Sequence, residues 1–307
     1  MSSRSIVTRQ PVTDALSFLE ALRPRQWTKN LIVLAPVFFR FSPRIETVLP
    51  GLIFMALFCM VSSAFYLIND LADREKDRLH PKKRLRPIAA GRVTPGQAAG
   101  LAGLLLCAAL GVASQVSAPG ALLLLVYCVV QVLYNLWAKQ MVLLDLLFIA
   151  SGFVLRAGGG AVASQIPLSP WFLLCVGLLA VFLGIEKRKG EMAHLAGTAG
   201  TTRAVLRDYT PRLLERMEQV VVSGGVVTYA LWSAGPQLNG APSQFMMLTV
   251  PVVLYGVFRY LWLSEQGCDT ERPEDLIVAD RPLLWTAGCW LIVTALVLAG
   301  HAMRWID

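Results

Sequence analysis

Residues 47–69 read TVLPGLIFMALFCMVSSAFYLIN and contain no charged residue. A helix of roughly 20 apolar residues crosses the ~30 Å hydrocarbon core of a bilayer, so this stretch predicts a transmembrane helix. Similar apolar runs predict eight further spans, of which the first is short, at residues 28–40, 95–115, 119–137, 141–162, 170–186, 213–234, 243–264 and 283–304. The expected fold is therefore all-α, a polytopic membrane bundle of about nine transmembrane helices.

The composition agrees with a membrane protein. Of the 307 residues, 55% are hydrophobic and only 16% are charged, whereas ordinary soluble domains carry about 25% charged residues. A soluble fold would need a core too large for one domain. The six cysteines are scattered without a C-x-x-C pair, and the three histidines show no metal-ligand spacing. Neither residue type predicts a zinc or redox site.

The N-terminal segment differs from the rest of the chain. Residues 1–30 lack the uninterrupted apolar region and the cleavage site of a signal peptide. The stretch Thr13–Leu22 predicts a short amphipathic helix on the membrane surface, with Thr13 as its N-cap. No internal repeat or long linker divides the remainder. We therefore expect a cytoplasmic arm with an interfacial helix at 1–22 and one transmembrane catalytic domain at 23–307.

Charge placement predicts the orientation. Most of the 28 Lys and Arg residues lie in the N-terminal arm and in every second loop, at 70–93, 187–212 and 265–281. The alternate loops hold none, apart from Arg44 in the turn at 41–46. The N-terminus and the basic loops are therefore expected on the cytoplasmic side of the cell (inner) membrane. The net charge of +8 suits anionic membrane lipids. Because these cations flank spans, no nucleic acid partner is expected.

The segment after residues 47–69 carries a polar motif. Residues 66–92 read YLINDLADREKDRLHPKKRLRPIAAGR. Steps of four residues overshoot one helical turn by about 40°, so Asn69, Asp73 and Asp77 are expected on one helix face, with Tyr66 beside them. Oxygen ligands of this kind suit Mg²⁺, which completes its shell with water and phosphate.

Asp70 is expected to point roughly 100° away from Asn69 and ranks below the other acidic residues. A basic run follows the acidic residues and contains Lys82, Lys83, Arg84 and Arg86. Carboxylates followed by cations predict a diphosphate clamp, with a metal on one side and positive side chains on the other. The alternative for the basic run is a solvated cytoplasmic loop.

Two ionisable residues lie inside one expected span. Such residues are costly in the membrane and usually mark function. Asp145 and Arg156 are eleven residues apart, which brings them to nearly the same helix face about 16 Å apart, too far for a direct pair. We expect them to face one cavity, with Tyr134 and Lys139 in the preceding turn. The alternative is structural polar pairing between helices.

A weaker polar cluster follows the sixth expected span. A basic loop is what orientation alone predicts at this place. The cluster comprises Glu186, Lys187, Arg188, Lys189, Glu191, Arg203, Arg207, Asp208 and Tyr209.

The motif N-D-x-x-D-x-x-x-D at Asn69–Asp77 and the run H-P-x-K-R-x-R-P-I-A-A-G at His80–Gly91 resemble the UbiA superfamily of intramembrane prenyltransferases. The resemblance implies a UbiA-like helical fold. It also implies that Asn69 and Asp73 hold Mg²⁺ against a diphosphate. Ordinary members have a second aspartate-rich motif after the sixth helix, and residues 186–210 here contain no D-x-x-x-D.

Three further motifs resemble a narrower branch, the decaprenyl-phosphate phosphoribosyltransferases. They are R-P-R-Q-W-T-K-N at Arg23–Asn30, Y-N-L-W-A-K…D…S-G-F-V-L-R-A at Tyr134–Ala157 and E-K-R-K-x-E at Glu186–Glu191. The similarity extends from about residue 20 to 300. It implies Mg²⁺-dependent transfer of a 5-phosphoribosyl group from phosphoribosyl diphosphate (PRPP) to a polyprenyl phosphate lipid. Diphosphate is released, and the product serves cell-envelope glycan or lipid-linked sugar synthesis.

Within that reaction, the basic residues are expected to bind phosphates and the tyrosines to position the sugar. The candidate metal ligands are Asn69 and Asp73. The candidate catalytic residues are Asp70, Asp73 and Asp77, and the candidate substrate-binding residues are Lys29, Tyr66, Lys83, Arg86, Tyr134, Lys139, Asp145, Arg156, Lys187 and Arg188.

Two other functions are compatible with parts of the sequence. An aromatic polyprenyltransferase of a quinone-type pathway would use a prenyl diphosphate, and the missing second aspartate motif counts against it. A transporter would use Asp145 and Arg156 as an ion path. The sequence leaves the lipid length and the oligomeric state open, a homo-oligomer included.

Overall fold

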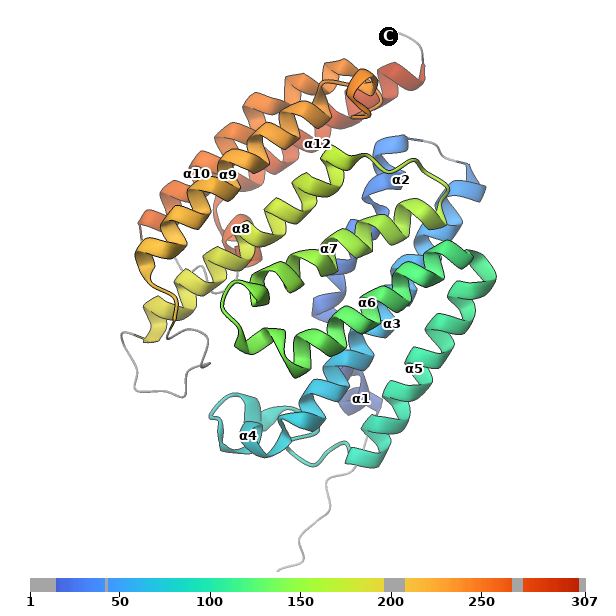
Figure 1. Cartoon of the computed structure of the whole chain (residues 1–307), viewed down its shortest axis with the longest axis vertical. Coiled ribbons are helices and arrows are strands. Elements are labelled where there is room, and N and C mark those ends of the chain that lie inside the picture. The colour runs from blue at the N-terminus through green and yellow to red at the C-terminus, as the bar shows by residue number, and fades with distance from the viewer. Residues whose placement is uncertain (1–14, 42–43, 196–207, 267–272, 304–307) are drawn as a thin grey trace, which may run out of the picture. The chain divides into compact units, whose positions relative to one another are not determined.

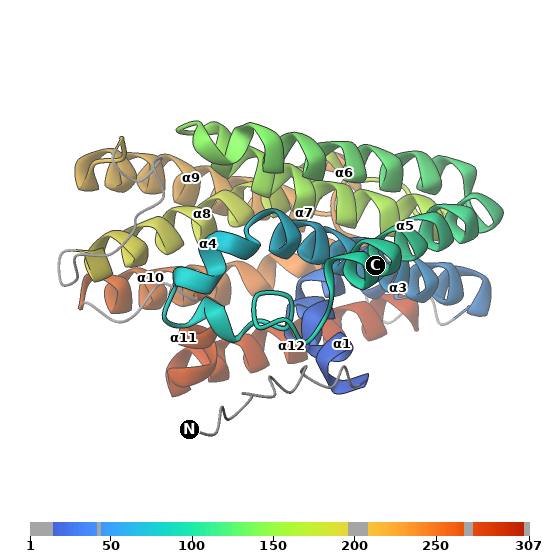
Figure 2. The same ribbon diagram turned by 90° about the horizontal axis from the view of Figure 1, so that it is seen from below.

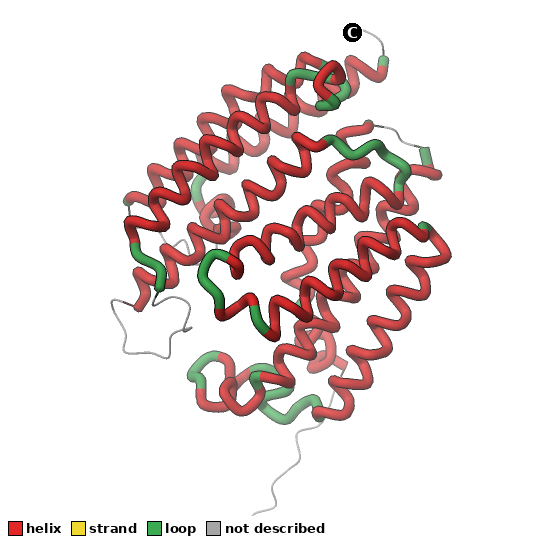
Figure 3. Tube along the Cα trace, in the orientation of Figure 1, coloured by secondary structure: helices red, strands yellow, loops and turns green. Residues whose placement is uncertain are grey.

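The computed structural model describes residues 15–41, 44–195, 208–266 and 273–303, which fold into helices with no strand among them (Figures 1 and 3). The α-helices are α1 (Ala15–Leu22), α2 (Ala35–Arg40), α3 (Ile45–Ala72), α4 (Arg74–Leu79), α5 (Pro95–Val116), α6 (Ala118–Leu136), α7 (Leu144–Ala163), α8 (Pro170–Leu195), α9 (Pro211–Ser233), α10 (Val250–Glu265), α11 (Pro273–Ala279) and α12 (Arg281–Ala302). The 3₁₀ segments are η1 (Pro24–Leu34), η2 (Lys83–Leu85), η3 (Ala138–Gln140), η5 (Pro236–Leu238) and η6 (Gln244–Thr249). The all-α prediction is confirmed.

Seven helices in the described part of the chain are long and apolar enough to cross a membrane. They are α3, α5, α6, α7, α8, the continuous η6–α10 segment and α12. Many of their large apolar side chains are exposed, and Leu104, Leu122 and Leu296 are each at least 60% exposed. In a membrane these side chains meet lipid rather than water. The chain is a multi-pass membrane protein.

The predicted count of nine spans is not confirmed. Residues 28–40 are divided between η1 and α2, and this segment is too short for a span and is interrupted by Pro36. The expected span at 213–234 corresponds to α9, which is helical. Its first two turns carry Arg212, Glu215, Arg216 and Glu218, and these charges lower its mean hydropathy below that of the seven membrane helices.

The chain divides into two compact units, which are described one at a time. Unit 1 comprises Met1–Leu31 and Met55–Gln115, and unit 2 comprises Ile32–Phe54 and Val116–Asp307. Helix α3 contributes to both. The core of unit 1 is rich in small side chains, which let helices approach closely. It contains Ala21, Ala64, Leu67, Ile88, Val93, Ala98 and Ala102.

Polar contacts hold the N-terminal segment of unit 1 against α3. The Ser63 hydroxyl donates to the carbonyl of Leu22 (2.9 Å) and accepts from the indole of Trp27 (3.0 Å). The Arg92 guanidinium pairs with Glu20 of α1 at 2.7 Å. The predicted helix at 13–22 is confirmed from Ala15 onward, and its expected cap, Thr13, lies outside the described residues. Its placement on the membrane surface stays a prediction.

In unit 2, α6, α7, α8 and α9 pack as successive neighbours (Figures 1 and 2). One close approach requires a glycine. A Cβ atom on Gly160 would lie 1.9 Å from the carbonyl oxygen of Val33. Gly160 therefore lets the end of η1 lie directly on α7, and no larger residue fits without displacing the backbone.

Candidate functional site

The acidic motif of unit 1 lies where α3 gives way to α4. Helix α3 ends at Ala72, Asp73 adopts φ −94° and ψ 5°, and α4 begins at Arg74. The backbone N–H of Asp73 still donates to the carbonyl of Asn69 (2.9 Å), and that of Asp77 donates to the carbonyl of Asp73 (2.8 Å). The motif is therefore interrupted at Asp73 instead of forming one continuous helix face.

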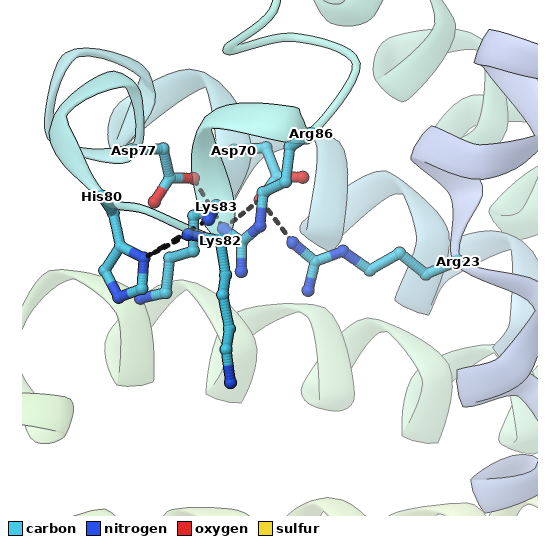
Figure 4. Close-up of polar contacts among 7 residues, drawn as sticks. All are labelled: Arg23, Asp70, Asp77, His80, Lys82, Lys83 and Arg86. Carbon is cyan, nitrogen blue, oxygen red and sulfur yellow. Dashed lines mark hydrogen bonds and ion pairs between the residues drawn. The ribbon is translucent and has the colours of Figure 1, made fainter.

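An ion-pair cluster joins two of the carboxylates. Nη1 of Arg86 lies 3.0 Å from Oδ1 of Asp70 and 2.6 Å from Oδ2 of Asp77, and Nη2 of Arg23 lies 2.5 Å from Oδ1 of Asp70 (Figure 4). The side chains of Asp70 and Asp77 are 4% and 5% exposed. Burying two carboxylates is costly without counter-charges. Two guanidiniums balance them here, and Arg23 also lies over the ring of Tyr66.

This arrangement corrects the predicted grouping of the acidic residues. Asp77 was expected to align with Asn69 and Asp73, apart from Asp70. Seven residues fall only about 20° short of two helical turns, so Asp77 returns to the side of Asp70, where Arg86 binds both. Each of the two four-residue steps from Asn69 to Asp77 adds about 40° of rotation around the helix axis. The sum turns the side chain of Asp77 away from that of Asn69.

Asn69 and Asp73 are left available for a ligand. Both side chains are half-buried, and neither makes a hydrogen bond or ion pair with a described residue. They lie at the C-terminal end of α3, where the partial negative charge of the helix favours cations. Among the described residues, no three His, Cys, Asp or Glu side chains gather into a metal-binding group. Mg²⁺ needs no such cage, since one or two carboxylate or amide oxygens with water and phosphate suffice.

The basic run after α4 points largely to solvent. Nδ1 of His80 accepts hydrogen bonds from the backbone N–H groups of Lys82 (3.2 Å) and Lys83 (3.3 Å), which shapes the turn (Figure 4). The side chains of Lys82, Lys83 and Arg84 are exposed, whereas Arg86 is half-buried in the ion-pair cluster. The run therefore separates into exposed cations suited to an incoming anion and one internal cation.

Unit 2 contains a second buried charge network, centred on Asp145 at the start of α7. Nη2 of Arg188 lies 2.9 Å from Oδ2 of Asp145, and the two side chains are 2% and 0% exposed. Arg188 also binds Glu191 at 2.5 Å, and the hydroxyl of Tyr209 donates to Oδ1 of Asp145 at 2.7 Å. This network ties α7, α8 and the segment before α9 together.

Tyr209 also fixes the backbone that leads into α7. Its hydroxyl accepts a hydrogen bond from the N–H of Leu143 at 2.9 Å. Leu143 has φ 70°, an unfavourable value for a branched side chain. Burial and the hydrogen bond to Asp145 raise the pKa of Tyr209 above its ordinary value. The phenol therefore stays protonated at neutral pH and acts as the donor to Asp145.

A further polar cluster links α8, α9 and α10. Nζ of Lys189 lies 3.0 Å from Glu186 and 2.5 Å from Glu218. The hydroxyl of Ser264 donates to Glu186 at 2.6 Å. The basic stretch after the sixth expected span is therefore not a solvated loop at Arg188 and Lys189. It is the last part of α8, in which Arg188 and Lys189 form ion pairs with buried carboxylates.

The described contacts of Arg156 differ from those of Asp145. Nη2 of Arg156 donates to the hydroxyl of Tyr127 on α6 (2.6 Å), and its Nη1 donates to the carbonyl of Gly152 (3.0 Å). The guanidinium also lies over the rings of Tyr127 and Phe153. The expectation of one common cavity for Asp145 and Arg156 gains no support. These contacts favour the alternative, polar pairing between helices.

We expect Tyr127→Phe and Arg156→Lys each to lower the free energy of unfolding by about 1–3 kcal/mol, because each leaves a buried polar group poorly paired. Turnover per folded molecule should change little. Chemical unfolding in detergent and activity on the soluble fraction measure the two effects. Tyr255→Phe is the matched control, since Tyr255 is 52% exposed. An Arg156→Lys variant of wild-type stability and low activity would instead indicate the predicted phosphate-guiding role.

The other predicted site residues are distributed along both units. Lys29 of η1 and Tyr66 of α3 are half-buried in unit 1. In unit 2, Tyr134 lies near the end of α6, and Lys187 on α8 is half-buried. Lys139 in η3 makes no ion pair with a described residue. Arg203 and Arg207 lie outside the described residues.

Sequence reasoning missed several participants. Glu218 was detectable, because it is a carboxylate within an expected span. Arg23 lies in a quoted motif, but nothing in the sequence pairs it with Asp70. Nothing in the sequence pairs Tyr127 with Arg156 either. Nδ2 of Asn135, beside Tyr134, is buried without a hydrogen-bond partner among the described residues, and it is a further candidate for a ligand contact.

Comparison with known proteins adds to this geometry. The model of the UbiA prenyltransferase family matches residues 31–274. The chain is 34% identical over 304 residues to a decaprenyl-phosphate phosphoribosyltransferase of Mycolicibacterium smegmatis, covering 95% of each chain. It is 34% identical to a protein of the same name from Corynebacterium glutamicum, covering 96% of this chain and 90% of that one.

The fold is also similar to that of a solved structure, a UbiA homolog from Archaeoglobus fulgidus bound to DMAPP and Mg²⁺. The TM-score is 0.65 at 19% sequence identity, with 92% of this chain and 99% of that chain covered. At this identity the likeness concerns the fold.

Proposed function

The chain belongs to the UbiA prenyltransferase family, and from this premise we propose that it transfers a 5-phosphoribosyl group from PRPP to a polyprenyl phosphate of the decaprenyl type, releasing diphosphate. The chain is a transferase, which sets aside the transporter alternative. The observation that carries the proposal is the 34% identity over 95% of both chains to a protein named for this lipid and this transfer.

The acidic motif of unit 1 is assigned to the diphosphate. Asn69 and Asp73 would hold Mg²⁺, since they are oxygen donors without a described protein partner. When bound, the metal supplies positive charge next to the departing diphosphate. Asp70 and Asp77 have another role. Arg23 and Arg86 neutralise them and hold the turn between α3 and α4 in place.

Cationic side chains are assigned to the remaining phosphates. Lys83 is exposed beside the acidic motif and is a candidate for diphosphate oxygens. Lys139 of unit 2 has no described ion-pair partner and is a candidate for a phosphate. Lys29 and Lys187 are candidates for guiding the lipid phosphate or the 5-phosphate. Arg188 is engaged by Asp145 and Glu191, so we assign it to positioning α7 against α8.

The reaction needs no strong general base. An oxygen of the lipid phosphate forms a bond to C1 of the ribose, and the bond from C1 to the diphosphate oxygen breaks. The electron pair leaves with diphosphate. The lipid phosphate is already ionised at neutral pH, so no proton has to be removed first. Alignment of the nucleophile opposite the leaving group is what the protein must provide.

Donor choice separates this proposal from the aromatic prenyltransferase alternative. With purified protein and Mg²⁺, we expect a lipid product from PRPP and polyprenyl phosphate, and none from a prenyl diphosphate and an aromatic acid. Unlabelled PRPP should displace labelled PRPP, whereas geranyl diphosphate should displace it poorly. Transfer of a prenyl group to the aromatic acid would support the alternative. The physical basis is the absence of a second aspartate motif in residues 186–210.

A further inference from the structure

Two adjoining hollows lie at one end of unit 2. The first has a volume of about 460 Å³ and is lined by Arg40, Arg44 and His301, together with the apolar side chains of Phe41 and Leu298. The second has a volume of about 250 Å³ and shares Arg40 and Arg44 with the first. Arg40 ends α2, Arg44 directly precedes α3, and Leu298 and His301 lie near the end of α12, and all four line the first hollow. Helices α2 and α12 are labelled in Figure 1.

The two arginines that join the hollows, Arg40 and Arg44, have no carboxylate partner among the described residues. The side chains of Arg40 and Arg44 form no ion pair or hydrogen bond with a described residue. Glu46 lines the second hollow and, among the described residues, pairs with neither arginine. Two guanidinium groups that line the same hollow without a described carboxylate partner attract an anion. Their planar arrangement of N–H donors suits the oxygens of a phosphate.

Buried polar atoms at the same place also lack partners. Ser164 directly follows α7 and lines the second hollow. The residue is 4% exposed, and its Oγ has no hydrogen-bond partner among the described residues. Nδ1 of His301, in the last turn of α12, is also buried without one. Buried polar atoms are normally satisfied. A ligand with several acceptor oxygens would satisfy them together.

The positions of the polar lining residues at the ends of membrane helices indicate where the anion comes from. Arg44 immediately precedes α3, Ser164 follows α7, and His301 lies in the last turn of α12. All three are therefore at ends of membrane helices, where lipid headgroups lie. In the orientation that the basic loops predict, this is the side opposite those loops, where cations are usually sparse. A specific ligand accounts for two arginines here better than topology does.

We propose that Arg40, Arg44 and His301, with Ser164, form a second anion site that binds a phosphate ester carrying an apolar substituent. The site belongs to unit 2 and is independent of the transfer reaction proposed above. The polar side chains would bind the phosphate oxygens, and Phe41 and Leu298 would contact the apolar part. A membrane phospholipid headgroup and a free phosphate share this chemistry.

The test uses the full chain in nanodiscs with equal amounts of phosphatidylglycerol and phosphatidylcholine, followed by native mass spectrometry. We expect Arg40→Gln/Arg44→Gln to lower retention of phosphatidylglycerol by about tenfold or more, since two charge-assisted contacts are lost. The matched control is Arg212→Gln/Arg216→Gln. It removes two exposed arginines at the same spacing in unit 2 and should retain the lipid as the wild type does.

A second arm titrates inorganic phosphate against the same proteins in a zwitterionic detergent and follows the unfolding temperature. Arginine-dependent stabilisation by phosphate without lipid retention would identify a soluble phosphate ester as the ligand. Retention of phosphatidylglycerol without that stabilisation would identify the headgroup. Equal behaviour of the double variant and the wild type in both arms would overturn the proposal. If the double variant aggregates, the single variants Arg40→Gln and Arg44→Gln replace it, each with an intermediate loss expected.

Discussion

Replacing Asp73 with alanine is expected to lower kcat/KM by about 10³-fold, roughly 4 kcal/mol in the transition state, while the protein keeps its unfolding midpoint in detergent. The reason is that no arginine among the described residues neutralises Asp73, whereas arginines pair with Asp70 and Asp77. The side chain of Asp73 makes no described contact within the fold. Its removal should therefore lower activity without changing stability. Product formation from PRPP and a polyprenyl phosphate measures the change.

The controls separate a metal role from general damage to this loop. Glu75→Ala removes a carboxylate two residues away that is 75% exposed and should leave activity near the wild-type level. A chelator should abolish wild-type activity, and added Mg²⁺ should restore it. Full activity of Asp73→Ala, or of the chelated enzyme, would exclude the proposed metal role of Asn69 and Asp73.

Asp70→Ala should behave differently from Asp73→Ala. It leaves Arg23 and Arg86 without their shared carboxylate, so we expect a loss of about 1–3 kcal/mol in the free energy of unfolding. Its direct effect on activity should be smaller than that of Asp73→Ala. The reverse order of activities would place the metal on Asp70.

The largest expected effect on stability concerns Arg188. We expect Arg188→Met to lower the free energy of unfolding by about 3–5 kcal/mol, because it leaves a buried Asp145 without its counter-charge. Asp145 is fully buried, and Arg188 is its sole ion-pair partner among the described residues. Unfolding by sodium dodecyl sulfate in mixed micelles, followed by intrinsic fluorescence, measures the loss.

The double variant Asp145→Leu/Arg188→Met is the decisive comparison. Removing both charges removes the uncompensated carboxylate, so the double variant should recover part of the stability that Arg188→Met loses. Lys187→Met, one position away on α8 with a half-buried side chain, serves as a control for stability only. A stable but inactive Arg188→Met variant would contradict the positioning role and favour the predicted contact of Arg188 with a phosphate.

The sequence by itself determined the fold class and the family, and it predicted each of the seven long apolar helices found among the described residues, because these depend on properties that are local along the chain. In a bilayer, the backbone N–H and C=O groups of an apolar run such as 47–69 must form hydrogen bonds within the run itself, as they do in a helix. Hydropathy alone therefore predicts this membrane helix. Motif order from Arg23 to Glu191 was sufficient for the family, which the family model and the relatives confirm. The count of nine is not confirmed at 28–40 and at α9, where a proline and charged residues interrupt the apolar pattern.

Only the tertiary structure decided which charges neutralise one another. Arg23 and Asp70 are 47 residues apart, and Asp145 and Arg188 are 43 apart. No spacing rule connects such residues, because their distance depends on how separate segments pack. The same packing pairs Asp70 and Asp77 with arginines and leaves Asn69 and Asp73 without a side-chain partner in the described part of the chain. It also leaves Arg40 and Arg44 lining two shared hollows with no carboxylate partner among the residues that the structure describes. The sequence shows which charged residues are present, whereas the packing of the helices decides which of them form ion pairs.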